Sequence, residues 1–486
     1  MNAGKPKIGL QRQLSPAHVW SIAFGCIIGW GAFVNPGKKF LPNSGVDGTT
    51  IAMLLGALVM IVIAFSYAYM VPRYPKAGGE FTFAKTCFGR NIAFVCGWFL
   101  MAAYLTNVPM NSTAIGLIVD GLDGPGDILK WGFHYKIAGF DVWCGEMMLA
   151  MGILLFLGWL NIIGVKKAGV IQTLLATLLA LSVVMLAIAA LVSASADVNN
   201  LSPVWGFDKT AAMAANATVE TIAPFAHVGR QGIITAVLAT FAITPWAFVG
   251  FETIPQAVEE FKFSYSKVMV IMTVAILFGA FVYIANNYVA AIAVREWPDK
   301  VIAGEWVLLC AAENMLGVSG KVLLGIAVSS AVLSGIMGFY LASSRLMFSM
   351  AREGYLPKIF AKIDERYGTP RNAVLFCIVI SLSGPILGRE ALGWFVDMSA
   401  IGASVGFFFT SLSGLYTMKS KGEGGVLLKT AAMAGAVFSV LFVLLQLVPI
   451  PGFPDVHYGK ESYIMLLVWI ALGSVFLMGL QKRNRE

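Results

Sequence analysis

The sequence contains little charge. Only 12% of its 486 residues are Asp, Glu, Lys or Arg, whereas 58% are hydrophobic, and the mean hydropathy is +0.78. Such a balance excludes an ordinary soluble protein. The net charge of +8 does not indicate nucleic acid as a partner, because the basic residues lie mostly in short connectors between apolar runs.

The patterns of a metal centre or an enzyme active site are also lacking. Six cysteines are scattered singly without a CxxC pair, and four histidines show no ligand spacing. We therefore expect structural thiols, no disulfides, no metal and no other cofactor. No nucleophile–base set or phosphate loop is found, so an enzyme is not expected. We expect no cleavable signal either, because the first apolar run is too long and others follow it.

What the sequence does contain is a series of apolar runs long enough to cross a bilayer. We count twelve spans, at about residues 18–42, 49–71, 91–119, 145–163, 166–193, 231–257, 265–294, 319–349, 372–387, 391–417, 426–449 and 461–480. Most of the 34 Lys and Arg residues fall in the N-tail, the C-tail and alternate connectors. This bias predicts a multi-pass protein of the inner (cytoplasmic) membrane with both termini in the cytoplasm.

Two of these spans contain residues that interrupt a helix. The first holds Gly25-Cys26-Ile27-Ile28-Gly29-Trp30-Gly31, and the sixth holds Pro245, Gly250 and Pro255 around Glu252. Spans that lie five apart start on opposite sides of the membrane. The pair of interruptions therefore predicts an inverted five-plus-five repeat with a substrate held between the two breaks.

The predicted repeat divides the chain into six parts. They are a cytoplasmic N-tail at 1–17, a first repeat of spans one to five at 18–193, an extracellular loop at 194–230, a second repeat of spans six to ten at 231–417, two further spans at 418–480 and a cytoplasmic C-tail at 481–486.

A broken membrane helix exposes N–H groups at the start of one half and carbonyl groups at the end of the other. Two such breaks can hold a zwitterion without a charged side chain. We assign the carboxylate to the N–H groups of Trp30, Gly31 and Ala32. The ammonium is assigned to the carbonyls of Cys26, Ile27, Trp246 and Val249. The alternative for the glycines is close helix packing of the GxxxG kind.

Other side chains near the breaks are candidates for gating. Trp246 and Phe248 flank the second break and either line the pocket, with Trp246 as its gate, or pack against lipid or core. Glu252 is a carboxyl inside a span, which suits a proton relay or a protonation-linked gate. Its alternative is a structural hydrogen bond to a freed backbone N–H. For Glu259 and Glu260, at the cytoplasmic edge, a solvated face is favoured over pairing with Arg or Lys.

An ion site is a further hypothesis. A sodium ion would need oxygen atoms from spans one and eight, which Ser334 and the carbonyls of Gly25 and Ile28 could supply in part. H⁺ and Na⁺ both stay open as coupling ions.

Four motifs, in order along the chain, resemble those of the amino acid–polyamine–organocation transporters. The first span's GCIIGWGAF is similar to G-x-x-x-G-x-G-x-F, and PKAGGEF at 75–81 to P-x-A-G-G-x-Y/F. WAFVGFETIPQAVEE at 246–260 resembles the family's sixth-span motif. The stretch from Ser344 to Pro357, followed by Thr369-Pro370, resembles its S-R…A-R-(E/D)-G-x-x-P…T-P signature.

The resemblance implies an all-α membrane protein with a LeuT-type fold: twelve transmembrane helices, discontinuous helices 1 and 6, and two peripheral helices. It also implies secondary active transport of amino acids or related amines by alternating access. Carried over by position, Gly29, Trp30 and Gly31 match the carboxylate loop, and Trp246 matches an aromatic position that lines or gates the pocket. Phe339 falls where some members place an aromatic ring against the substrate.

Two departures from the family pattern bear on substrate and coupling. The middle residue of the G-x-G loop is commonly small, but here it is Trp30. Some proton-coupled members carry a lysine in span five; its position falls near Leu179, and no lysine lies between Lys167 and Lys209.

We therefore expect an amino acid transporter, either a symporter or an exchanger. The alternatives are a transporter of a decarboxylated amine or polyamine, and a channel. The expected partners are the small-molecule substrate and the lipid bilayer, in a monomer or a homodimer.

Overall fold

The computed structural model describes residues 9–123, 127–137, 140–388, 391–449 and 457–483. The elements of the first half are α1 (Pro16–Ile27), α2 (Gly31–Asn35), the π-helical turn η1 (Pro36–Phe40), α3 (Leu41–Met70), α4 (Gly79–Phe88), α5 (Arg90–Asp123), β1 (His134–Ile137), β2 (Phe140–Trp143), α6 (Cys144–Ile162), α7 (Val165–Val192), η3 (Val198–Leu201), α8 (Lys209–Ala214) and η4 (Ala223–Phe225).

The elements of the second half are α9 (Gly229–Phe241), α10 (Thr244–Ala247), the 3₁₀-helix η5 (Phe251–Glu260), η6 (Tyr265–Lys267), α11 (Val268–Ile292), α12 (Trp297–Ile302), α13 (Val307–Leu316), α14 (Val318–Arg352), η7 (Lys358–Ala361), α15 (Arg371–Ser381), α16 (Ser383–Leu387), α17 (Ala391–Ser420), α18 (Val426–Leu447) and α19 (Lys460–Arg483).

The described residues include ten helical segments long and apolar enough to cross a membrane. The chain is therefore a multi-pass, all-α membrane protein. The remaining two predicted spans, the first and the ninth, coincide with shorter apolar helices at Pro16–Ile27 and Arg371–Leu387. The count of twelve spans, the inverted repeat and the division into parts stay predictions.

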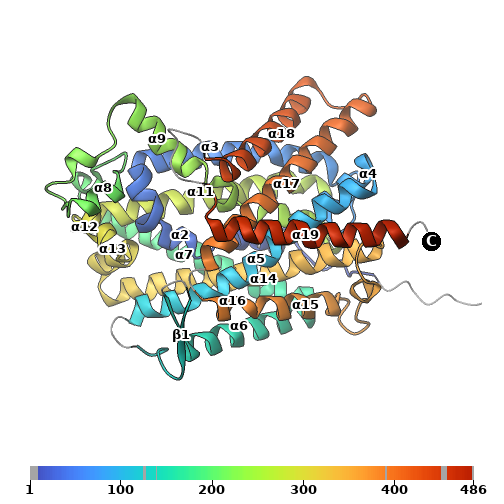
Figure 1. Cartoon of the computed structure of the whole chain (residues 1–486), viewed down its shortest axis with the longest axis horizontal. Helices are drawn as coiled ribbons and strands as arrows, with labels where there is room; N and C mark the ends of the chain where they lie inside the picture. Colours follow the sequence, from blue (N-terminus) through green and yellow to red (C-terminus); the bar gives the residue numbers. More distant parts are fainter. Residues whose placement is uncertain (1–8, 124–126, 138–139, 389–390, 450–456, 484–486) are drawn as a thin grey trace, which may run out of the picture.

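Helices α3, α6, α14 and α19 run in nearly the same direction, whereas α17 and α18 are inclined to them (Figure 1). Elements α8, α12 and α13 gather at one end of this bundle, whereas α4 and the C-terminus lie at the other. Helix α5 packs along both α14 and α17, and α1 is enclosed by α7, α11, α14 and η5. The interrupted first helix is therefore in the interior, where an unwound turn can face protein rather than lipid.

Both ends of the described chain lie at the α4 end of the bundle. The Gln13 N–H donates to the Glu260 carbonyl at 2.8 Å, which places the start of the chain against the end of η5. Helix α19 runs antiparallel to α5: Trp98 stacks on Trp469 at 4.6 Å, while Ala102, further along α5, clusters with the earlier residue Leu466. Two chain ends on the same side of the bundle are consistent with an even number of membrane spans.

Local chemistry explains where the first helix begins. Helix α1 begins at Pro16 because the Ser15 hydroxyl accepts from the His18 N–H at 3.3 Å, and proline is favoured in the first turn.

The outer connector at 120–143 contains a hairpin that the sequence did not predict. In this hairpin His134 pairs with Trp143, and their rings stack at 4.3 Å.

Candidate functional site

The first helix is interrupted between α1 and α2, inside the predicted glycine-rich stretch. Ile28 is extended (φ −99°, ψ 100°), and helical geometry resumes at Gly31. Within the described residues, the N–H groups of Gly29, Trp30 and Gly31 make no hydrogen bond, whereas that of Ala32 donates to the Gly29 carbonyl at 3.3 Å. The free donors are therefore Gly29, Trp30 and Gly31, and the predicted donor Ala32 is already bonded.

The sixth span is interrupted between α10 and η5. Gly250 has φ 145°, which side-chain-bearing residues rarely adopt, and an added Cβ there would lie 2.5 Å from the Ile27 nitrogen. Both the backbone angle and the lack of space for a side chain therefore require glycine at this position. The close approach also means that the two breaks touch through their main chains, as the zwitterion hypothesis requires.

Two tryptophans cover the meeting point of the breaks. The Trp30 and Trp246 ring centroids are 6.2 Å apart, and both side chains are buried. An added Cβ at Gly31 would lie only 2.2 Å from Cη2 of Trp246, so this ring rests directly on the start of α2. The indole Nε1 of Trp30 has no hydrogen-bond partner among the described residues.

The predicted carbonyl acceptors differ in their surroundings. The Ile27 carbonyl accepts from the Tyr283 hydroxyl at 3.2 Å, and the Trp246 carbonyl accepts from the Val249 N–H at 3.1 Å. A carbonyl has two lone pairs, so that of Ile27 can still face a cation. The Trp246 carbonyl also accepts from the Phe248 N–H, so this predicted acceptor is already occupied. The Phe248 ring is fully buried against Tyr283 and therefore packs in the protein beside the second break.

The position of Phe339 links the substrate region to Glu252. Its buried ring lies 6.2 Å from that of Tyr104, whose hydroxyl donates to the Glu252 carbonyl at 3.2 Å. One residue earlier, an added Cβ at Gly338 would lie 2.3 Å from Sγ of Cys26, so α14 packs closely on the end of α1. The structure thus brings Cys26 and Phe339 to the same region.

Glu252 is fully buried directly after the second break. Its Oε2 accepts from the Gly250 N–H at 2.8 Å, and its Oε1 has no partner among the described residues. The structural alternative, a bond to a freed backbone N–H, is therefore present. The unpartnered oxygen leaves the protonation-linked role open.

The prediction that Glu259 and Glu260 form a solvated face is wrong. Glu260 is buried in an ion pair with Arg345, with a 2.9 Å contact, and Glu259 contacts Arg352 at 2.7 Å. The Glu259 carboxylate also accepts from the Ala77 N–H at 2.9 Å. The positions of Glu259 and Glu260 at the end of an apolar run suggested exposure, but α14 and the loop before α4 cover this end of η5.

At the hypothetical ion site the structure places an amide. The Gln172 Nε2 of α7 donates to the carbonyls of Ser21 and Ser334, each at 3.1 Å, and would lie 2.5 Å from a Cβ added at Gly25. The Ser334 hydroxyl donates to the Gly25 carbonyl at 3.5 Å. Gln172 thus joins α1 to α14 beside the oxygen atoms of Gly25 and Ser334 that were predicted to bind an ion. Ile28, the third predicted residue of the ion site, is also buried.

Sequence reasoning assigned no substrate role to Asn111 of α5. Its Oδ1 is buried without a partner within the described residues and would lie 3.1 Å from a Cβ added at Gly29. An acceptor aimed at the first break suits an ammonium group. The signal in the sequence that could have indicated Asn111 is an amide within an apolar span. Spans three, seven and eight contain several such polar residues, so this signal did not distinguish Asn111 from the others.

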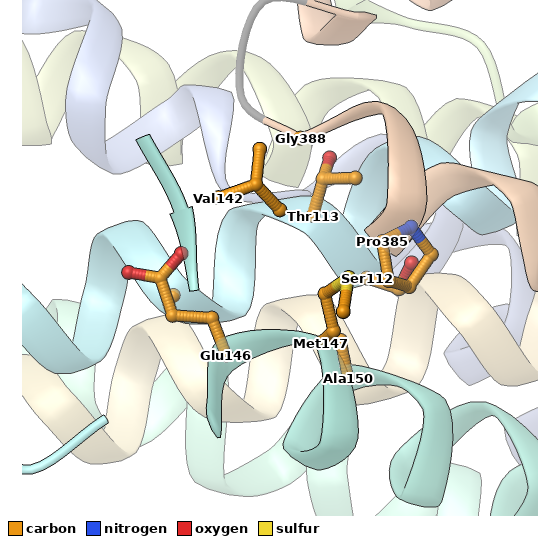
Figure 2. Close-up of a pocket in the computed structure, with 9 residues that line it drawn as sticks. Ser112, Thr113, Val142, Glu146, Met147, Ala150, Pro385 and Gly388 are labelled. Atoms are coloured by element: carbon orange, nitrogen blue, oxygen red, sulfur yellow. The ribbon is translucent and has the colours of Figure 1, made fainter. Parts of the chain in front are cut away.

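A separate small cavity lies between α5, α6, α16 and the hairpin (Figure 2). It is lined by Ser112, Thr113, Gly116, Val142, Glu146, Met147, Ala150, Pro385 and Gly388. Its volume of about 20 Å³ suits a single water molecule and is too small for an amino acid. This cavity is therefore not the candidate substrate site.

Comparison with known proteins identifies the family of the chain. Residues 14–475 match the family described as Amino acid permease. The chain is 28% identical to the human Large neutral amino acids transporter small subunit 2, over 78% of this chain and 65% of the relative. It is 26% identical to the human Asc-type amino acid transporter 1, over 76% of this chain and 65% of the relative. The chain thus spans just under two thirds of the length of these curated relatives.

Proposed function

The chain belongs to the amino acid permease family, and from that premise we propose that it carries an amino acid across the cytoplasmic membrane by alternating access. The observation that carries the proposal is the contact between the two helix breaks, where Gly250 lies against Ile27 beside three free N–H groups. Free N–H groups at a helix start attract a carboxylate. Carbonyl groups at a helix end attract an ammonium.

We propose a neutral amino acid as the substrate. A zwitterion uses both kinds of main-chain group, whereas a decarboxylated amine or polyamine would leave the N–H groups of Gly29, Trp30 and Gly31 unpaired in a dry site. The relatives named for large neutral amino acids and for Asc-type transport support the same choice. The buried Trp30 ring would limit the volume open to the substrate side chain.

The residues around the breaks have distinct proposed roles. Gly29, Trp30 and Gly31 hold the carboxylate, and the carbonyls of Cys26, Ile27 and Val249 hold the ammonium together with the Asn111 oxygen. Trp246 closes the site by lying on Gly31.

Access from the α4 end would be controlled by η5. Two ion pairs, Arg345–Glu260 and Arg352–Glu259, attach η5 to α14. They would separate when the site opens on this side, which we assign to the cytoplasm from the distribution of basic residues. Both pairs are formed in the described conformation, which supports a closed state on this side.

The test uses purified protein in two assays. A thermal-shift screen against the twenty standard amino acids and a set of decarboxylated amines reports binding, because a ligand of the folded state stabilises it by mass action. Uptake into proteoliposomes then reports transport. Stabilisation and saturable, trans-stimulated uptake by neutral amino acids are expected. Stabilisation by amines alone would overturn the substrate class, and conductance far above transporter turnover would indicate a channel instead.

A further inference from the structure

One buried carboxyl group outside the helix breaks has no role in the substrate site. Glu80 lies in the first turn of α4 and is fully buried. It accepts hydrogen bonds from the Tyr67 hydroxyl of α3 at 2.7 Å and from Nε2 of Gln256 in η5 at 2.6 Å. Within the described residues, no Lys or Arg side chain forms an ion pair with it, in contrast to Glu259 and Glu260.

Among the residues that the structure describes, the groups that face Glu80 from the surrounding helices carry no positive charge. They are Tyr67 from α3, Cys96 and Tyr104 from α5, Gln256 and Glu252 from η5, and the Gly406 region of α17, with Thr410 beside Tyr67. The carboxyl of Glu252, a group of the same sign, also acts on Glu80. Burial of the unpaired carboxylate is the main cause that raises its pKa to about 8, and the two hydrogen bonds oppose the rise.

The amide of Gln256 can serve either protonation state of Glu80. With Nε2 toward the carboxylate, Gln256 donates, and its Oε1 is left buried without a partner within the described part of the chain. If the amide turns by 180°, Oε1 faces Glu80 and can accept a hydrogen bond from a protonated carboxyl. Gln256 can therefore pair with Glu80 whether or not the carboxyl carries a proton.

Glu80 is also positioned where the proposed gating movement would expose it. Pro255 and Gln256 of η5 would each lie 2.9 Å from a Cβ added at Gly79, so η5 packs directly on the start of α4. On the other side, the Ser349 hydroxyl of α14 donates to the Ala77 carbonyl at 2.6 Å. Movement of η5 away from α4 and α14 would remove Gln256 from Glu80 and admit water.

We propose that Glu80 is the binding site of a proton that is coupled to transport, taken up when η5 docks on α4 and released when η5 departs. The inference rests on the proposed function and names its coupling ion. The proton comes from water at the α4 end, binds Glu80 Oε2, and is then donated in a hydrogen bond to Gln256 Oε1. No covalent bond other than O–H forms or breaks.

The direction of the pH effect follows from the two states. The docked state retains a proton up to a pH of about 8, whereas a solvated glutamate loses it near 4.5. Lower pH therefore favours docking, and this preference declines as pH rises from about 4.5 to about 8. Between pH 7 and pH 9 the protonated fraction of a group that titrates at 8 changes about tenfold.

The experiment measures substrate uptake and proton movement together. Wild-type protein and E80Q are placed in proteoliposomes that contain a pH-sensitive dye, and an equimolar mixture of neutral L-amino acids is added at pH 5.5 to 9. The wild type should move protons with the amino acids, and its uptake should change about tenfold across the titration. E80Q should retain amino acid binding by thermal shift, move no protons and show a flat pH profile. The control E365Q alters an exposed glutamate and should behave as wild type.

The outcomes separate this inference from the proposed function. Uptake without proton movement in the wild type, or proton movement that persists in E80Q, would overturn the proton site and leave the transporter standing. No uptake and no binding in the wild type would overturn both. If E80Q does not fold, Y67F decides: loss of a donor to the carboxylate should move the midpoint of the profile to higher pH, and an unmoved midpoint would refute the site.

Discussion

The contact between Gly31 and Trp246 gives the sharpest test of the substrate site. In Gly31→Ala the added Cβ would lie 2.2 Å from Cη2 of Trp246 and 3.1 Å from Nδ2 of Asn35. Carbon atoms in ordinary contact are about 3.5–4.0 Å apart. The Trp246 ring must therefore move by more than an ångström, or α2 must shift.

The magnitude follows from what overpacking costs in a buried site. Inserting a methyl group against a ring of this kind costs about 1–3 kcal/mol. If the site must close with Trp246 over Gly31 when substrate is bound, the same free energy is lost from binding, which corresponds to a fall in affinity of roughly 5- to 150-fold. Gly31→Val, with two further methyl groups, should abolish uptake.

The assay compares uptake and substrate-induced thermal shift for Gly31→Ala and for Gly152→Ala. Gly152 is the matched control because it lies within α6 with nothing near its missing Cβ. Gly31→Ala should be folded but weak in both assays, and Trp246→Phe, which removes the Cη2 atom, should restore part of the loss. Normal uptake by Gly31→Ala and Gly31→Val would refute the assignment of this break to the substrate.

Two further predictions concern the carboxyl groups of η5. Glu252→Gln should shift the midpoint of the pH profile of uptake to lower values, because the nearby Glu252 charge raises the pKa of Glu80; an unchanged profile would reduce Glu252 to its bond with the Gly250 N–H. Arg345→Met leaves Glu260 buried and unpaired, so thermal or denaturant unfolding should show a loss of about 3–5 kcal/mol. Arg352→Met, at a half-exposed pair, should cost about 1 kcal/mol or less, and equal losses would contradict the burial argument.

The helical membrane architecture and both helix breaks could be predicted from the sequence, because glycine and proline act on the local backbone. Ile28 and Gly250 fall within the predicted interruptions. The resemblance of four motifs to a transporter family is confirmed by the match over residues 14–475. The choice of site residues and the coupling ion stay predictions.

Long-range pairing could not be predicted, because it depends on which side chains the fold brings together. Glu80 was visible only as the variable residue of the PKAGGEF motif, and nothing local indicated that Tyr67 and Gln256 would enclose it. The same holds for Gln172, which lies far in sequence from both carbonyl groups it joins. Glu259 and Glu260 were misjudged for this reason too.

The main-chain contact between the two breaks has a consequence for how selectivity could diversify. Apart from the Asn111 oxygen, the proposed anchors for carboxylate and ammonium are backbone atoms, so substitutions of the other surrounding side chains leave them in place. Trp30 and Phe339 could then be exchanged to reshape the space for the substrate side chain while recognition of the amino acid backbone persists. A laboratory search for altered specificity would do best to randomise these two positions and keep Gly31 and Gly250 fixed.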